Sequence, residues 1–144
     1  MRMQSTEATC GAAALYNALC AIGKHEPNLL ETAERVCKTT AASGTSVRQL
    51  VNGAKQLGGL GLRLDFSLAQ HAVAALYYHL ARGHSACIVV DDDAHWAAVV
   101  GSISTRLLVA DSADLELVLS LDEPTLCARW RSSGARKPYC MVVI

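Results

Sequence analysis

The spacing of hydrophobic residues predicts helices in most of the first half of the chain. Residues 11–22 are apolar on nearly every side, which is typical of a buried helix, and Gly23 follows as a stop signal. Helical spacing returns in three later segments, each preceded by Asn or Ser with Glu or Gln three positions on, the pattern of a capping box. The pairs are Asn28 with Glu31, Ser46 with Gln49 and Ser67 with Gln70, and the helices are expected over residues 29–37, 47–57 and 68–82.

The second half follows the two-residue period of β-strands. One strand comes early, because apolar and polar residues alternate over 60–66. Further strands are expected at residues 86–91, 95–103, 107–111, 115–119 and 139–144, with a short helix over 121–131. The order predicts an α+β fold in which an N-terminal helical lobe packs on a C-terminal antiparallel sheet, as one domain over residues 1–144.

Composition and charge agree with one globular domain and exclude several kinds of partner. The chain has 144 residues, 51% of them hydrophobic and 18% charged, and a chain of this length buries roughly 70% of its unfolded surface. Thirteen basic residues balance thirteen acidic ones, so no net field favours nucleic acid or an anionic membrane. No apolar run reaches the ~20 residues of a membrane span, and residues 1–9 lack the apolar segment of a signal peptide.

The cysteines fit a reducing cytoplasm better than a disulfide framework. All except Cys10 lie among apolar neighbours, so we interpret them as small buried hydrophobes. These five are Cys20, Cys37, Cys87, Cys127 and Cys140. The chain has no CxxC pair and no Cys/His set with zinc-finger spacing, so neither a metal nor another cofactor is expected.

Cys10 stands apart because it lies where the first helix begins. The unpaired N–H groups and the positive end of the macrodipole at a helix start favour a thiolate, which is the nucleophilic form of cysteine. Gly11 has no side chain, so a substrate carbonyl can approach the sulfur closely. Cys10 is therefore a candidate nucleophile, although a cysteine in this position is often only structural.

His95 and Asp111 are the candidate base and its orienting acid. His95 opens strand 95–103 and Asp111 ends strand 107–111, and two antiparallel neighbours can set the start of one beside the end of the other. His95 lies nine residues from Ser104, whereas Asp111 lies five from Arg106, so this pairing requires a stagger or a bulge. A carboxylate beside the imidazole would fix its tautomer and stabilise the imidazolium. Otherwise Asp111 is an ordinary turn residue.

Gln4 is a candidate oxyanion donor. It lies six residues before Cys10, and a short loop between them would let the side-chain amide reach back beside the sulfur. There it would donate to the oxyanion of a tetrahedral intermediate, together with the backbone N–H of Cys10.

These residues belong to short motifs that together resemble a known family. The motifs are Gln4-x5-Cys10-Gly11, Gly44-Thr45-Ser46, His95-Trp96-x-x-Val99-Val100-Gly101 and Val109-x-Asp111. In this order, and with 85 residues from Cys10 to His95 and 16 from His95 to Asp111, the chain resembles the bacteriocin-processing cysteine peptidases. Those are papain-like domains that bacterial export transporters carry to remove double-glycine leader peptides. Nearly the whole chain takes part, with departures at Thr9 and Ser112, where the family often has Asp and Pro.

The resemblance implies a papain-like cysteine peptidase fold with Cys10 as nucleophile, His95 as base, Asp111 as orienting acid and Gln4 as oxyanion donor. It also implies a peptide or protein substrate, cleaved after glycine in leader-like sequences. We expect a stand-alone domain without a transporter, and the sequence does not specify an associated export or effector system. Two alternatives stay open: an acyl transferase or glutamine deamidase with the same triad, and a non-catalytic peptide-binding module.

Overall fold

The computed structural model has an α+β fold, with three helices first and most of the strands in the second half of the chain, which confirms the predicted class. The structure describes residues 10–24, 28–37, 46–90, 95–111, 118–130 and 139–144. Its helices are α1 (Cys10–Ala21), α2 (Leu29–Val36), α3 (Val47–Gln56), α4 (Ala69–Leu80) and α5 (Glu123–Trp130). Its strands are β1 (Gly61–Asp65), β2 (Ser85–Val90), β3 (His95–Ile103), β4 (Arg106–Ala110), β5 (Val118–Asp122) and β6 (Tyr139–Val143).

All these strands form one antiparallel sheet in the order β1-β6-β2-β3-β4-β5. The last strand in the sequence, β6, lies between β1 and β2, so the end of the chain ties the early strand β1 to the rest of the sheet. Strands β2, β3, β4 and β5 pair in sequence order, as is typical of antiparallel strands joined by short connections.

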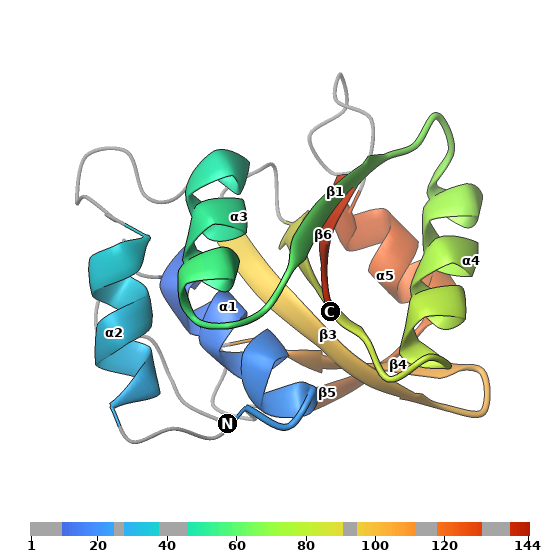
Figure 1. Ribbon diagram of the computed structural model, residues 1–144. Helices are drawn as coiled ribbons and strands as arrows, with labels where there is room; N and C mark the ends of the chain where they lie inside the picture. The colour runs from blue at the N-terminus through green and yellow to red at the C-terminus, as the bar shows by residue number, and fades with distance from the viewer. Residues whose placement is uncertain (1–9, 25–27, 38–45, 91–94, 112–117, 131–138) are drawn as a thin grey trace.

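Helices cover both faces of this sheet (Figure 1). On β3, Trp96 and Ala98 belong to the core beneath α1, α2 and α3, whereas the alternate residues Ala97 and Val99 belong to the core beneath α4 and α5. A strand buried on both faces carries a nearly continuous apolar run, because neither set of alternate residues faces water. This explains the run that follows His95 in β3.

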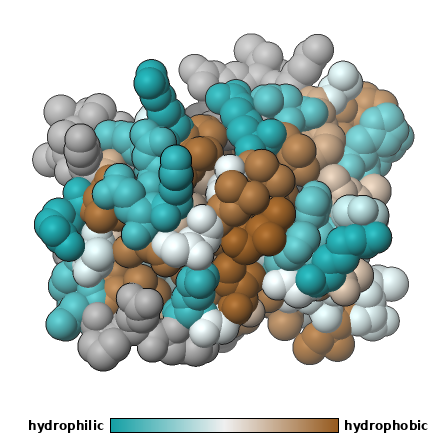
Figure 2. Space-filling model, viewed as in Figure 1, coloured by the Kyte–Doolittle hydropathy of each residue, from teal (hydrophilic) through white to brown (hydrophobic). Residues whose placement is uncertain are grey.

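The edge strand β1 leaves an apolar patch uncovered. Leu60 and Ile144 extend the β1–β6 pairing by exchanging backbone hydrogen bonds of 3.0 and 2.9 Å. Leu60, Leu62 and Ile144 are 49%, 40% and 37% exposed. Figure 2 shows apolar side chains gathered in the middle of this face. The alternation of apolar and polar residues over 60–66 predicted a strand with one face in water and one face covered. In the structure, α4 packs over β2, β3 and β6, and Leu64 is the leucine of β1 that packs against the core on that side, whereas Leu62 stays exposed.

Helix α1 is the central helix that its apolar sequence predicted. Most of its residues are buried, and it packs on β2 and β3 as well as on α2 and α3. Behind it, Gly53 of α3 allows a close helix approach, because an added Cβ would lie 2.8 Å from Cys37 Sγ and 3.0 Å from Leu15 Cδ2. On the sheet side, the buried Ser85 hydroxyl donates a 2.7 Å hydrogen bond to the Ala18 carbonyl. These contacts hold α1, and hence its first residue, in a fixed place.

One of the three predicted capping boxes is confirmed. Gln49 N donates to Ser46 Oγ at 3.2 Å and Ser46 N donates to Gln49 Oε1 at 2.7 Å, so α3 begins as predicted. The box at Asn28 is wrong, because Asn28 has φ 61° and its side chain makes no capping bond. Asparagine tolerates this left-handed conformation better than most residues and serves here as a turn. The box at Ser67 is also wrong, because α4 starts one residue later, after the extended Leu68.

The fifth strand lies further along the chain than predicted. It was expected over 115–119, but β5 spans Val118–Asp122, and residues 115–117 are outside the described residues. Leucine alternates from 115 to 121, so the two-residue pattern alone does not decide where the strand lies. The following helix is accordingly shorter than 121–131, and Asp122 Oδ1 accepts a 2.9 Å hydrogen bond from Thr125 N at its start.

Candidate active site

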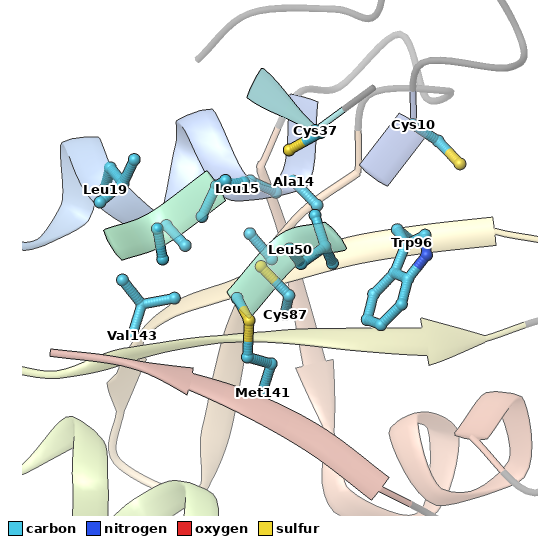
Figure 3. Close-up of a cluster of buried hydrophobic side chains, with 14 of the residues drawn as sticks. Cys10, Ala14, Leu15, Leu19, Cys37, Leu50, Cys87, Trp96, Met141 and Val143 are labelled. Carbon is cyan, nitrogen blue, oxygen red and sulfur yellow. The ribbon is translucent and has the colours of Figure 1, made fainter. Parts of the chain in front are cut away.

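Cys10 is the first residue of α1, one position before the predicted start of that helix. It is 7% exposed and lies at the edge of the core beneath α1. Figure 3 shows its sulfur at the end of the helix, pointing away from the rest of the cluster, with Trp96 of β3 close by. Buried support behind the residue and an outward sulfur at a helix N-terminus are what a positioned nucleophile requires.

His95 and Asp111 meet because β3 contains a bulge. Val99 is opposite Val109, but Gly101 is opposite Leu108, so one extra residue, Val100, stands in β3. The unequal distances from the turn had predicted a stagger or a bulge, and this bulge accounts for one residue of the difference. The imidazole Nε2 of His95 lies 2.5 Å from Asp111 Oδ1. The predicted pairing of the start of one strand with the end of the next is therefore present.

The imidazole also faces Cys10. Asp111 occupies Nε2 of the ring, and a side-chain hydrogen bond links the ring to the Cys10 thiol. We infer that Nδ1 is the ring nitrogen that interacts with the sulfur. Cys10, His95 and Asp111 thus form a continuous hydrogen-bonded series, from the start of α1, through the start of β3, to the residue after β4. The chemistry that this order allows is proton transfer between a thiol and an imidazole held by a carboxylate.

The electrostatics of the pair favour a thiolate and an imidazolium. Burial raises the pKa of Cys10, but the His95 hydrogen bond, the Trp96 backbone N–H, the His95 charge and the Gly11 backbone N–H outweigh it, so the net pKa is lowered. Burial lowers the pKa of His95, but hydrogen bonds and charges from Asp111 and Cys10 outweigh it and raise the pKa to about 9. Both shifts favour the state in which the proton resides on His95 and the sulfur is a thiolate.

The buried cysteines outside the site show the opposite tendency. Cys37 and Cys140 are completely buried, and burial raises the pKa of each thiol to about 12. Burial also raises the pKa of Cys87. All six cysteines are free, and Cys20 and Cys127 are partly buried rather than fully buried as predicted.

We expect iodoacetamide at pH 6 to alkylate Cys10 before any other cysteine. The lowered pKa of Cys10 increases its fraction of thiolate, whereas the raised pKa values of Cys37 and Cys140 keep those thiols protonated. The rate at Cys10 should change again near pH 9, where His95 loses its proton and the thiolate loses its counter-ion. Peptide mass spectrometry over a pH series measures both features, and uniform labelling would contradict the assignment.

One side chain that the sequence analysis did not identify, Arg129, also reaches the site. Arg129 Nη2, from α5, donates a 3.0 Å hydrogen bond to Asp111 Oδ2. A local signal was present, because Arg129 shares one helix face with Leu126 and Trp130, both buried at helical spacing. That face shows that Arg129 points toward the sheet, but it does not identify the carboxylate that it meets.

Several predicted residues and groups stay predictions. Gln4, like Gly44 and Thr45 of the second motif, lies outside the described residues, so its role as oxyanion donor stays a prediction.

Within the described ranges, no three His, Cys, Asp or Glu side chains are grouped in a way that could hold a metal ion. No helix in those ranges has the length and apolar character needed to cross a membrane.

Comparison with known proteins identifies relatives of the fold but not of the sequence. No protein-family model and no curated protein matches the chain. The peptidase domain of Streptococcus ComA, a bi-functional ABC transporter of a quorum-sensing pathway, aligns with 99% of this chain and 95% of its own, at 17% identity and a TM-score of 0.72. A double glycine motif protease from an AMS/PCAT transporter, solved with the leader peptide, aligns with 98% of this chain and 87% of its own, at 16% identity and a TM-score of 0.66.

The peptidase domain of Streptococcus mutans ComA gives the same result. It aligns with 100% of this chain and 98% of its own, at 16% identity and a TM-score of 0.66. The chain therefore has the fold of these peptidase domains, as the sequence motifs implied, and it spans 87–98% of the length of each of them.

Proposed function

We propose that this chain is a cysteine peptidase, a single papain-like domain over residues 1–144 that cleaves peptide bonds with Cys10, His95 and Asp111. The observation that carries the proposal is the hydrogen-bonded series from the Cys10 thiol through the His95 imidazole to the Asp111 carboxylate. The lowered pKa of Cys10 and the raised pKa of His95 support it, because they match a nucleophile and its proton carrier. The likeness of fold to domains named as peptidases adds further support.

The proposed mechanism uses each of these groups in turn. The Cys10 thiolate attacks the carbonyl carbon of the scissile bond, and the electron pair moves to the carbonyl oxygen. The His95 imidazolium gives its proton to the leaving amine as the tetrahedral intermediate collapses to a thioester. Neutral His95 then takes a proton from water, which attacks the thioester and releases the acid. Asp111 stabilises the imidazolium and holds its ring in place.

Gln4 is proposed as the side-chain donor to the oxyanion, with the Cys10 backbone N–H as the second donor. A Gln4→Ala variant should lose on the order of 10²–10³ in kcat with little change in KM, because the donor acts on charge that develops in the transition state. Steady-state kinetics measure the split. Gln70→Ala, an exposed position on α4, is the matched control and should be silent. An unaltered kcat in Gln4→Ala would remove Gln4 from the site.

The proposed substrates are peptides with two glycines before the scissile bond. The thiol and the imidazole are largely buried, at 7% exposure for Cys10 and 13% for the His95 side chain, and we infer from this burial that the approach to the sulfur is narrow. A residue without a side chain passes such an approach most easily. One solved neighbour is a double glycine motif protease bound to a leader peptide, which supports the same choice. The free cysteines support work in a reducing cytoplasm.

A matched pair of peptides tests the proposal. One carries Gly-Gly before the scissile bond, the other Val-Val in an otherwise identical sequence, and liquid chromatography with mass spectrometry follows the products. Cleavage after the second glycine, with the valine peptide intact, is the expected result. A peptide converted from amide to acid without cleavage would indicate a glutamine deamidase, and a joined product an acyl transferase. Binding without any chemical change would indicate a peptide-binding module.

A further inference from the structure

The carboxylate of Asp111 is shared between two layers of the fold. Its Oδ1 faces His95 Nε2 at 2.5 Å, and its Oδ2 accepts a hydrogen bond from Arg129 Nη2 at 3.0 Å. Arg129 comes from α5, on the face of the sheet opposite α1, which carries Cys10 (Figure 1). The site therefore draws residues from both faces of the sheet: Cys10 comes from the α1 side and Arg129 from the α5 side.

We propose that Arg129 is a positioning residue that holds the Asp111 carboxylate in the orientation His95 requires and limits its charge on the imidazole. This inference rests on the proposed function, since it assigns a role within the same site. Arg129 lies beyond Asp111 in the hydrogen-bonded series, so it acts through Asp111 and not on the substrate.

Burial explains why Asp111 needs this second partner. Its side chain is 6% exposed, and a carboxylate removed from water is strongly destabilised unless its oxygens accept hydrogen bonds or meet a cation. Asp111 follows the last residue of β4, so the strand ladder does not extend to it. Arg129 adds a constraint from another element, because it binds Asp111 from α5, whose Leu126 and Trp130 are anchored in the core.

The charge of Arg129 also affects the proton on His95. The charged and titratable groups that the described elements bring to His95 are Cys10, Asp111 and, beyond Asp111, Arg129. A cation near the carboxylate opposes protonation of the imidazole, so Arg129 keeps the pKa of His95 lower than Asp111 alone would set it. His95 must give its proton to the leaving amine, and a proton that is held too tightly slows that step.

Arg129→Met tests the proposal without relying on peptide turnover. Removing the cation should raise the pKa of His95 by about one unit above its value near 9, which a histidine ring NMR titration measures. The alkaline change in the Cys10 alkylation profile should move upward by the same amount. With a cleavable peptide, kcat should fall about 10- to 100-fold with KM nearly unchanged, because the ring is less well held. Arg129→Lys keeps the positive charge but not the planar guanidinium, so it should bring the pKa of His95 back toward its wild-type value while kcat recovers less.

Controls separate positioning from packing. Arg106, the exposed first residue of β4, also binds through its guanidinium, with Nε 2.8 Å from Ser120 Oγ, so Arg106→Met should leave the His95 titration unchanged. Within an Asp111→Asn background, Arg129→Met should have no further effect on Cys10 alkylation if Arg129 acts through Asp111. Arg129→Gln provides a neutral variant of similar polarity should Arg129→Met fold poorly.

The outcomes distinguish this inference from the proposed function. A lower melting temperature in the Arg129 variants with an unchanged His95 titration and Cys10 profile would reduce Arg129 to a packing residue and overturn the inference. A full additional effect of Arg129→Met in the Asp111→Asn background would also overturn it. A wild-type protein that cleaves no peptide would contradict the proposed function, whereas the His95 titration would still decide the role of Arg129.

Discussion

Replacing Cys10 with alanine should lower kcat/KM for a double-glycine peptide by about 10⁴-fold or more while the protein stays folded. The thiolate forms the covalent bond in the proposed mechanism, and the residues that follow Cys10 in the first turn of α1 are glycine and alanines, which carry no nucleophile. Alanine suits a helix and is only one sulfur atom smaller, so the free energy of unfolding should change little. Steady-state kinetics and a melting curve measure the two quantities.

The matched control lies on the same helix. Cys20 is partly buried near the C-terminal end of α1 and packs against the same core, so Cys20→Ala should retain activity. The proposed nucleophile would be wrong if Cys10→Ala cleaved at near the wild-type rate, or if Cys20→Ala caused the loss instead. Binding of peptide by Cys10→Ala, measured by calorimetry, should persist, since the substitution leaves the rest of the site in place.

Replacing His95 with alanine should cause the second largest loss, on the order of 10²–10⁴ in kcat/KM. Two effects combine in this variant. The leaving amine has no proton donor, and the pKa of Cys10 rises because burial still acts on the thiol while the hydrogen bond and charge of the imidazole are gone. Alkylation of Cys10 at pH 6 should therefore slow in parallel, which links the kinetic loss to the thiolate rather than to unfolding.

His71→Ala is the control for this prediction. His71 is exposed on α4, away from Cys10, and its removal should alter neither peptide cleavage nor alkylation. The role of His95 as base would fail if His95→Ala remained stable and lost activity without any change in Cys10 alkylation. In that case another group would set the ionisation of the thiol, and the backbone N–H groups of Trp96 and Gly11 would be the remaining candidates.

The sequence by itself determined the parts of the site that follow from local patterns. The apolar run after Cys10 predicts a buried helix, because a helix that is apolar all round has no face for water, and α1 begins at Cys10. The apolar run after His95 predicts β3 with its observed bounds. The unequal distances from the turn predicted a stagger or a bulge, and the structure places a bulge at Val100. Gln4 remains a prediction, since it lies outside the described residues.

Tertiary structure alone decided the features that depend on distant contacts. The alternating leucines before and within β5 allow more than one position for that strand, and its pairing with β4 selects Val118–Asp122. Asn28 with Glu31 matches the sequence pattern of a capping box, but in the structure Asn28 adopts the left-handed conformation and its side chain makes no capping hydrogen bond. Arg129 meets Asp111 across 18 positions of chain, because α5 packs back over the sheet. Periodicity records which face of an element is buried, whereas the partner of a buried charge depends on how separate elements pack together.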